Sequence, residues 1–154
     1  IELLQEGESL LGQGVPEKAR TAFESAVGKW QEDYTARVLL AKCLLFLEKD
    51  KEAAFQARQA QKLFPSEPQG YYISGLALTS AGKYDRAFRD FSRCDSLLPG
   101  NPQLTFYKGY TQDKTGRQKQ AANEYAAYLE MINYASNRYS QYAYNRLKEW
   151  GYVR

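Results

Sequence analysis

The stretch GLALTSAGKYDRAF, residues 75–88, contains two glycines seven residues apart and an alanine five residues further on. The residues around it have the apolar periodicity of helices, in which an interior glycine costs about 1 kcal/mol relative to alanine. The two glycines therefore need a reason, which is either a ligand-binding loop or close packing between helices. A comparison of the chain with itself distinguishes the two.

A spacing of 34 residues relates these small residues to the rest of the chain, with no insertion or deletion. The equivalents of Gly75 and Ala87 are all glycine or alanine, and the equivalents of Gly82 in the other three complete repeats are glycine except for one glutamate. These three sets are Gly7, Ala41, Gly75, Gly109 and Ala143; Gly14, Glu48, Gly82 and Gly116; and Ala19, Ala53, Ala87 and Ala121. A fourth set is Phe23, Ala57, Phe91 and Tyr125. The chain is therefore built of tandem repeats.

Each repeat is predicted to form two helices joined by a turn. Gly82 suits the turn because glycine has no steric penalty in the left-handed conformation that ends many helices. Gly75 lies inside a helix, where the absence of a side chain, with Ala87 opposite, lets the two helices approach closely. The periodicity predicts helices near residues 1–12, 17–29, 34–47, 51–63, 68–81, 85–97, 102–115, 118–132 and 136–150.

This pattern resembles the tetratricopeptide repeat family, whose unit is a 34-residue helix-turn-helix with small, turn and aromatic residues in this order. Residues 68–101 are the best copy. The resemblance implies an all-α fold, a right-handed superhelical solenoid of antiparallel helix pairs with about nine helices. We expect one array over residues 1–154, with repeats at about 1–33, 34–67, 68–101 and 102–135 and a capping helix at 136–150.

The N-terminal helix begins with apolar residues that nothing in the sequence precedes, and the first residue is Ile1 rather than Met. We therefore expect the chain to be a segment of a longer protein. Any targeting signal would then lie upstream of Ile1, which leaves both cytoplasm and periplasm open. Two interpretations of the apolar helix remain open: an upstream repeat covers it, or a partner chain does, including a second copy in a homo-oligomer.

Composition argues against several classes of function. The chain has no histidine and two cysteines far apart in sequence, so common metal clusters and histidine-assisted nucleophiles are not expected. We predict no enzyme activity, no catalytic residue, no metal site and no cofactor. No disulfide is expected between Cys43 and Cys94. No run of 18 apolar residues is present, so membrane insertion is not expected.

The resemblance implies that a peptide binds along the first helix of each repeat, at positions 2, 5, 9 and 12. Aromatic and aliphatic residues at positions 5 and 9 favour an apolar or aromatic-rich segment of a partner protein. The chain would then be a protein–protein interaction module or scaffold. An alternative is that these rings pack inside the protein. The predicted peptide-binding residues are Val38, Lys42, Leu45, Tyr72, Leu76, Thr79, Phe106, Tyr110, Asp113 and Tyr144.

The sequence is less consistent with several other kinds of partner. Chaperone-binding members hold an acidic tail with lysines and asparagines at positions 5 and 9 of the first unit and with basic residues in the third. This chain has Leu4 and Glu8 in the first unit and Tyr72 and Leu76 in the third, so no carboxylate clamp is expected. A second interpretation is a self-association or assembly module within a larger bacterial envelope protein, such as the tail of a protease or assembly factor. Seven tyrosines between Tyr125 and Tyr152 suggest single-stranded nucleic acid, but packing positions account for several of them, and this partner is not expected.

Overall fold

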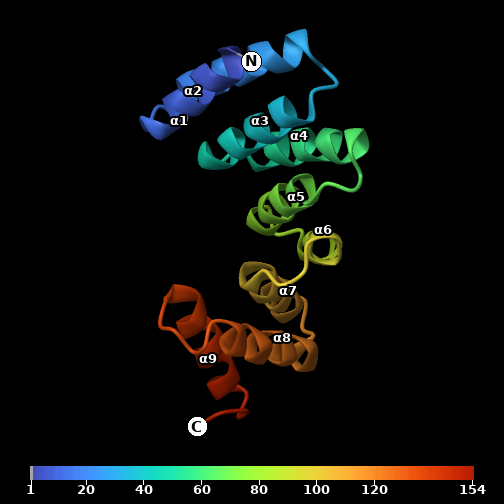
Figure 1. Ribbon diagram of the computed structural model, residues 1–154. Coiled ribbons are helices and arrows are strands. Elements are labelled where there is room, and N and C mark those ends of the chain that lie inside the picture. Colours follow the sequence, from blue (N-terminus) through green and yellow to red (C-terminus); the bar gives the residue numbers. More distant parts are fainter. Residues whose placement is uncertain (1) are drawn as a thin grey trace. The chain divides into compact units, whose positions relative to one another are not determined.

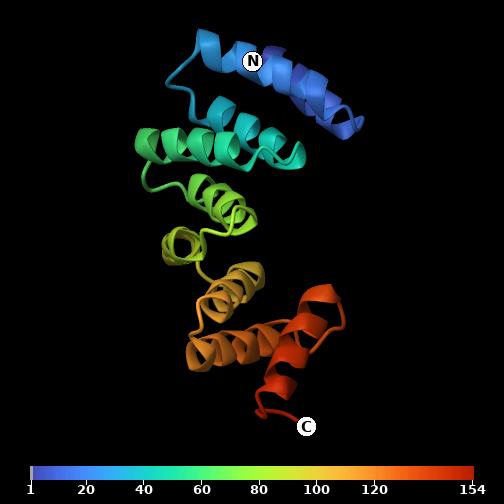
Figure 2. The same ribbon diagram turned by 180° about the vertical axis from the view of Figure 1, so that it is seen from behind.

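The computed structural model describes residues 2–154, and this part of the chain contains nine α-helices and no strand (Figure 1). Each predicted helix is confirmed, with ends that differ by two residues at most, apart from Ile1, which lies outside the described residues. The helices are α1 (Glu2–Gly12), α2 (Pro16–Lys29), α3 (Tyr34–Phe46), α4 (Asp50–Leu63), α5 (Pro68–Ser80), α6 (Tyr84–Leu97), α7 (Pro102–Lys114), α8 (Gln118–Met131) and α9 (Arg138–Glu149). Figure 2, seen from behind, shows α9 against α8.

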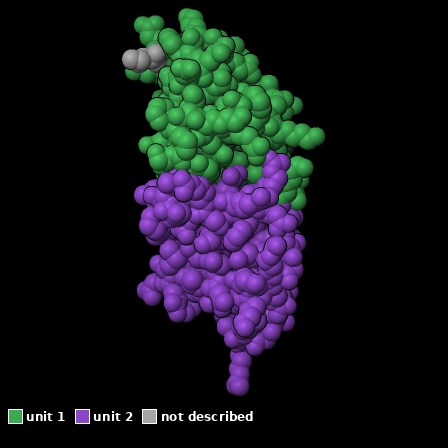
Figure 3. Space-filling view, turned by 90° about the vertical axis from the view of Figure 1, so that its right-hand side faces the viewer, with its two compact units in different colours: residues 1–83 green, residues 84–154 purple. Residues whose placement is uncertain are grey.

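The chain divides into two compact units, Ile1–Lys83 and Tyr84–Arg154, called unit 1 and unit 2 (Figure 3). In unit 1 each helix packs on the next, and α3 also contacts both α1 and α5. In unit 2, α6 packs on α7, α7 on α8, and α8 on α9. This is the layered packing of a helical solenoid. The third predicted repeat, 68–101, contributes one helix to each unit, and the single array over 1–154 stays a prediction.

The residues that recur every 34 positions form the cores of the two units. Ala19, Ala53, Ala87 and Ala121 are all 0% exposed, as are Phe23, Phe91 and Tyr125. Small residues of the first helices face these large ones. A Cβ atom added to Gly109 would lie 3.0 Å from Cδ1 of Tyr125, and one added to Gly7 would overlap the ring of Phe23. Glycine at these positions therefore permits close packing of paired helices.

The turn glycines end the first helices in the left-handed conformation. Gly14, Gly82 and Gly116 have φ angles of 77°, 76° and 79°. In each case the following amide donates a hydrogen bond back into the helix, as from Lys83 N to Leu78 O at 2.8 Å. Glu48 occupies the equivalent turn with a φ of 58°, and Lys49 N donates to Leu44 O at 2.9 Å. The same turn is therefore made with a residue that has a Cβ atom.

Replacement of Glu48 by glycine should stabilise unit 1. A non-glycine residue in the left-handed region costs about 1–2 kcal/mol, and glycine removes this cost. Part of the gain in stability is offset by the greater freedom of glycine in the unfolded chain. We expect Glu48→Gly to raise the free energy of unfolding by about 0.5–1 kcal/mol, measured by urea denaturation. Glu32→Gly is the control, because Glu32 is an exposed turn residue without a positive φ, and it should give no gain.

Candidate functional site

In unit 1, the predicted peptide-binding residues lie on α3 and α5, two helices that contact each other. Lys42 is exposed, while Leu45, Tyr72, Leu76 and Thr79 are partly exposed. The Thr79 hydroxyl donates to Gly75 O within its own helix, at 2.7 Å. Val38 is only 6% exposed and packs with Ala41, Ala57, Ala60 and Ile73. Most of this predicted set therefore presents some surface in unit 1, and Val38 supports it from beneath.

One residue of this surface was missed by the sequence analysis. Phe46 follows Lys42 by four residues and so lies on the same side of α3, and its side chain is 64% exposed. Its equivalents 34 residues apart are Gly12, Ser80 and Lys114, none of them aromatic. An exposed ring at a position where the other repeats have small or polar residues is the signal that could have identified it. We call Lys42, Leu45, Phe46, Tyr72, Leu76 and Thr79 the first-helix face of unit 1.

In unit 2, two of the predicted binding residues, Phe106 and Asp113, lie inside the protein. The Phe106 ring is 3% exposed and packs against tyrosines of α7, α8 and α9. Its ring centroid is 5.1 Å from that of Tyr139 and 5.4 Å from that of Tyr128. Tyr110 is partly exposed and stacks on Phe106 at 6.1 Å. For Phe106, the structure matches the alternative in which the ring packs inside the protein.

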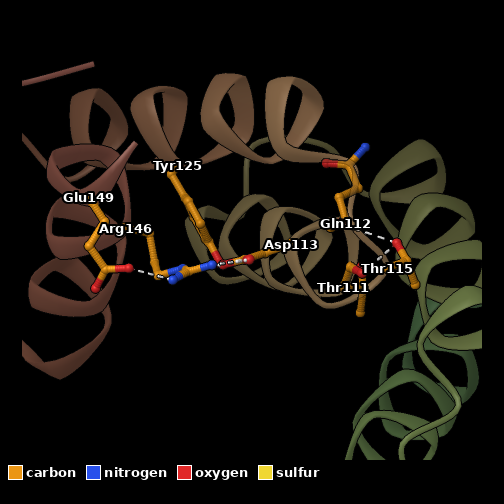
Figure 4. A network of polar contacts seen from close by, with 7 residues as sticks. All are labelled: Thr111, Gln112, Asp113, Thr115, Tyr125, Arg146 and Glu149. Carbon is orange, nitrogen blue, oxygen red and sulfur yellow. Dashed lines mark hydrogen bonds and ion pairs between the residues drawn. The ribbon is translucent and has the colours of Figure 1, made fainter. Parts of the chain in front are cut away.

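Asp113, the third predicted binding residue of unit 2, is held by an internal polar network (Figure 4). Arg146 of α9 donates from Nε and Nη2 to the two carboxylate oxygens of Asp113, at 2.9 Å and 2.8 Å. The Tyr125 hydroxyl of α8 donates to the same carboxylate at 2.9 Å. The Asp113 side chain is 4% exposed, whereas that of Arg146 is 30% exposed. One carboxylate of α7 therefore joins α8 and α9.

The network sets the protonation of its members. Burial raises the pKa of the Tyr125 hydroxyl, and the nearby Asp113 carboxylate raises it further. The hydrogen bonds to Asp113 raise the pKa of Arg146. Tyr125 thus remains a neutral donor and Arg146 a cation, which is the combination that a buried carboxylate requires.

The tyrosines near the C-terminus are mostly used for packing. Tyr125 stacks on Trp150 with ring centroids 6.1 Å apart, and the Arg146 guanidinium lies 4.7 Å from the centre of the Trp150 ring. Tyr142 packs on Tyr110 at 5.6 Å. Tyr144 is 41% exposed, and its hydroxyl donates to Arg154 O at 3.3 Å. Tyr134 and Tyr152 are also exposed, at 65% and 53%, whereas the other four tyrosines of this region, Tyr125, Tyr128, Tyr139 and Tyr142, pack in the core of unit 2.

The N-terminal helix packs on its own unit. Leu3, Leu4, Leu10 and Leu11 are partly buried and contact the core around Phe23. The large apolar side chains with the most exposure in unit 1 lie elsewhere, at Trp30, Phe46, Phe55 and Phe64. The apolar pattern of α1 is therefore explained in large part by packing within unit 1.

Both cysteines are buried free thiols. The Cys43 thiol donates to Pro16 O at 3.1 Å. Burial raises the pKa of Cys43, and it raises the pKa of Cys94 to about 11. Thiols of this kind are poor nucleophiles at neutral pH, so both residues serve packing.

Among the described residues, no helix combines the length and the apolar character that a membrane span requires.

Comparisons with known proteins agree with the repeat architecture. The family model for the tetratricopeptide repeat matches residues 4–58. No curated protein matches the sequence significantly. Solved structures do match: a crystal structure of MamA is 21% identical, covers 85% of this chain and 77% of its own, and has a TM-score of 0.80. MamA from Desulfovibrio magneticus RS-1 is 19% identical, with coverage of 88% and 76% and a TM-score of 0.80.

A third structure carries the family description itself. A thermophilic TPR protein of Thermus thermophilus is 18% identical, covers 97% of this chain and 82% of its own, and has a TM-score of 0.75. At these identities the likeness shows the fold, which confirms the predicted all-α solenoid of helix pairs. The family match over residues 4–58 agrees with the predicted resemblance to tetratricopeptide repeats in that part of the chain.

Proposed function

We propose that this chain is a protein–protein interaction module, or scaffold, that binds an apolar or aromatic-rich peptide segment of a partner on the first-helix face of unit 1. The observation that carries the proposal is Phe46, an aromatic side chain that is 64% exposed. Leu45 lies next to it in sequence, and Tyr72 and Leu76 on α5 add partly exposed apolar surface. Rings that become buried on binding supply much of the energy of protein interfaces.

Polar groups on this face suit a peptide backbone. Lys42 is exposed, forms no ion pair among the described residues, and lies one helical turn before Phe46. Its ammonium group can donate to a peptide carbonyl beside the apolar contacts. The proposed activity is binding without catalysis.

Unit 2 offers less to such a ligand. Of its predicted residues, Tyr144 and Tyr110 have accessible rings, whereas Phe106 and Asp113 are occupied by internal contacts. In the proposal these two support the positions of Tyr110 and α9. Self-association through α1, within an envelope protein or elsewhere, has less support because its leucines pack on the core of unit 1.

The proposal can be tested with peptides selected against the full chain from a phage-displayed library of random 12-residue sequences. We expect aromatic-rich clones, and we expect Phe46→Ser to weaken binding of the synthetic peptide at least about tenfold, as for an interface hot spot. Fluorescence anisotropy gives the Kd, and serine is the residue at the equivalent position 80.

Phe55→Asn is the matched control. Phe55 is 56% exposed on α4, in the same repeat but on another helix, and asparagine is the residue at the equivalent position 123. Circular dichroism should be unchanged in both variants. Equal binding by the wild-type chain and Phe46→Ser would contradict the proposal, and so would a loss confined to Phe55→Asn.

A further inference from the structure

A second surface of unit 1 has a different character. A groove of about 570 Å³ lies among α2, α3 and α4. Its buried apolar floor includes Val27, Leu40 and Leu44, which are 9%, 2% and 2% exposed, and Phe55 is part of its lining. Phe46 does not line it, since Phe46 and the lining residue Arg37 are nine residues apart and point to opposite sides of α3. The groove is therefore separate from the first-helix face.

Phe55 is exceptional in the repeat pattern. The residues equivalent to it are Thr21, Arg89 and Asn123, and all four positions are exposed. Three repeats thus place a polar residue on the surface here, as solvation requires, and only the second repeat places a ring. The Phe55 ring remains 56% exposed beside the apolar floor. Packing within unit 1 does not account for an aromatic residue at this position.

Arg37 supplies an unused positive charge in the same groove. Its Nε donates to Gln31 O at 3.2 Å, and its Nη1 donates to Gln56 Oε1 at 2.8 Å. Both acceptors are neutral, and among residues 2–154 neither a carboxylate nor any hydrogen-bond acceptor contacts Nη2. The guanidinium is therefore held in place by two neutral groups, while both N–H groups of Nη2 and its charge are available.

The other charges of the lining do not cancel that of Arg37. Glu24 and Glu52 both pair with Arg20, at 2.6 Å and 3.0 Å. Lys51 adds a further positive charge to the lining and forms no ion pair among the described residues. The lining itself has two basic and two acidic side chains, and Arg20, which lies outside the lining, pairs with both carboxylates. Arg37 and Lys51 are therefore the charged lining residues without an ion pair among the described residues. The groove therefore favours an anionic ligand that also has an apolar part.

From these contacts we infer that the groove among α2, α3 and α4 is a second docking site, which binds a partner segment carrying a Glu or Asp side chain beside a large apolar side chain. The carboxylate accepts from Nη2 of Arg37, a charge-assisted hydrogen bond that guanidinium groups form well. The apolar side chain lies on the floor and is covered by Phe55. This site does not depend on the first-helix face.

Two peptides that differ only in charge test the inference. The probes are acetyl-Gly-Leu-Phe-Glu-Gly amide and its Gln-containing twin, titrated into the full ¹⁵N-labelled chain and followed by NMR. We expect the Glu peptide to bind about tenfold more tightly, with amide shifts centred on Val27, Leu40 and Phe55, since the hydrogen bond from Arg37 to a carboxylate is stronger than one to a neutral amide. Equal affinities for the two peptides, or no shifts, would overturn the inference.

Variants assign the two parts of the site. Arg37→Gln should remove the preference for the Glu peptide, while Phe55→Asn should weaken both peptides and leave the preference in place. Arg58→Gln is the matched control, because Arg58 is exposed on α4 and does not line the groove. A preference that survives Arg37→Gln, or that Arg58→Gln also removes, would show that the carboxylate is not recognised by Arg37.

The same samples exclude other occupants. Binding of the Glu peptide should be unaffected by Phe46→Ser. The experiments can therefore contradict the groove and the first-helix face as binding sites independently of each other. Analytical ultracentrifugation without peptide should give one mass for wild type and Phe55→Asn. A dimer that Phe55→Asn dissociates would mean that a second copy occupies the groove, and the inference would be wrong.

Discussion

Arg146→Met should lower the free energy of unfolding of unit 2 by about 3 kcal/mol, because it leaves the carboxylate of Asp113 without its cation. The Asp113 side chain is 4% exposed and receives two hydrogen bonds from Arg146. Without the guanidinium, the Tyr125 hydroxyl is the only donor to Asp113 that remains among residues 2–154. An uncompensated buried carboxylate costs about 3–5 kcal/mol, and the lower value is appropriate because Arg146 itself is 30% exposed. Urea denaturation followed by circular dichroism measures the change.

The loss should fall first on α9. Arg146 is the residue of α9 that is hydrogen-bonded to the carboxylate of α7, and terminal helices of repeat proteins contact only their neighbours. In Arg146→Met, hydrogen exchange of the α9 amides should therefore be faster than in the wild-type chain. The increase should be larger for α9 than for α7. The contact between Arg146 and the Trp150 ring, 4.7 Å from its centre, is lost in the same variant and adds to this effect.

Two further variants test whether the unpaired charge of Asp113 causes the loss of stability. Arg138→Met removes an exposed arginine of the same helix, which donates to the Tyr139 hydroxyl at 2.7 Å, and should lower the free energy of unfolding much less than Arg146→Met. The double variant Asp113→Asn, Arg146→Met should be more stable than Arg146→Met alone, because no buried charge is then left unpaired. A cost below about 1 kcal/mol for Arg146→Met would show that Asp113 is solvated.

The helices could be predicted from sequence because the 34-residue spacing repeats the steric requirements of packing. Gly7 and Gly109 are small because Phe23 and Tyr125 lie against them, and Gly82 is glycine because its φ is 76°. Such requirements act between neighbouring helices and recur in every repeat. The spacing therefore identifies both the helices and their buried sides, even where the turn residue is Glu48.

The surface could be predicted only in part, because the repeat gives the direction of a side chain but not what covers it. Val38, Tyr72 and Phe106 occupy the same helical position, yet Phe106 is 3% exposed and Tyr72 is partly exposed. Tyr128, Tyr139 and Tyr142 pack on Phe106, whereas the residues 34 positions before these three tyrosines are Cys94, Thr105 and Lys108, none of them aromatic. Contacts of this kind depend on one particular neighbour.

In the sequence, the ion pair of Asp113 and the rings of Phe46 and Phe55 are indicated only by departures from the repeat, which are a weaker signal than the repeat itself. Asp113 stands where the other first helices have Leu11, Leu45, Thr79 and Leu147, so a carboxylate there lies among partly buried positions. Phe46 and Phe55 stand where other repeats have small or polar residues. Departures from a strict repeat are therefore the positions at which this chain differs in internal contacts or in surface.

Phe106→Ala is expected to cost about 3–5 kcal/mol in the free energy of unfolding, as for other fully buried aromatic residues. The ring is 3% exposed and lies within 6.1 Å, between centroids, of rings from α7, α8 and α9. Alanine would leave a cavity among these rings, which the tyrosines around it cannot fill without breaking their own contacts. Chemical denaturation of the variant gives the cost directly.

The result decides how Phe106 takes part in binding. A peptide-binding ring on an open surface could be removed with little change in stability, whereas a core ring cannot. Tyr144→Ala is the matched control in unit 2, because Tyr144 is 41% exposed, and its cost should stay below about 1 kcal/mol. If Phe106→Ala unfolds with wild-type stability, the ring is not part of the core. The prediction from sequence that Phe106 contacts the peptide directly would then stand. If Phe106→Ala is destabilised as expected, weaker peptide binding by this variant reflects a disturbed α7 and α9, and only surface variants such as Phe46→Ser can locate the ligand.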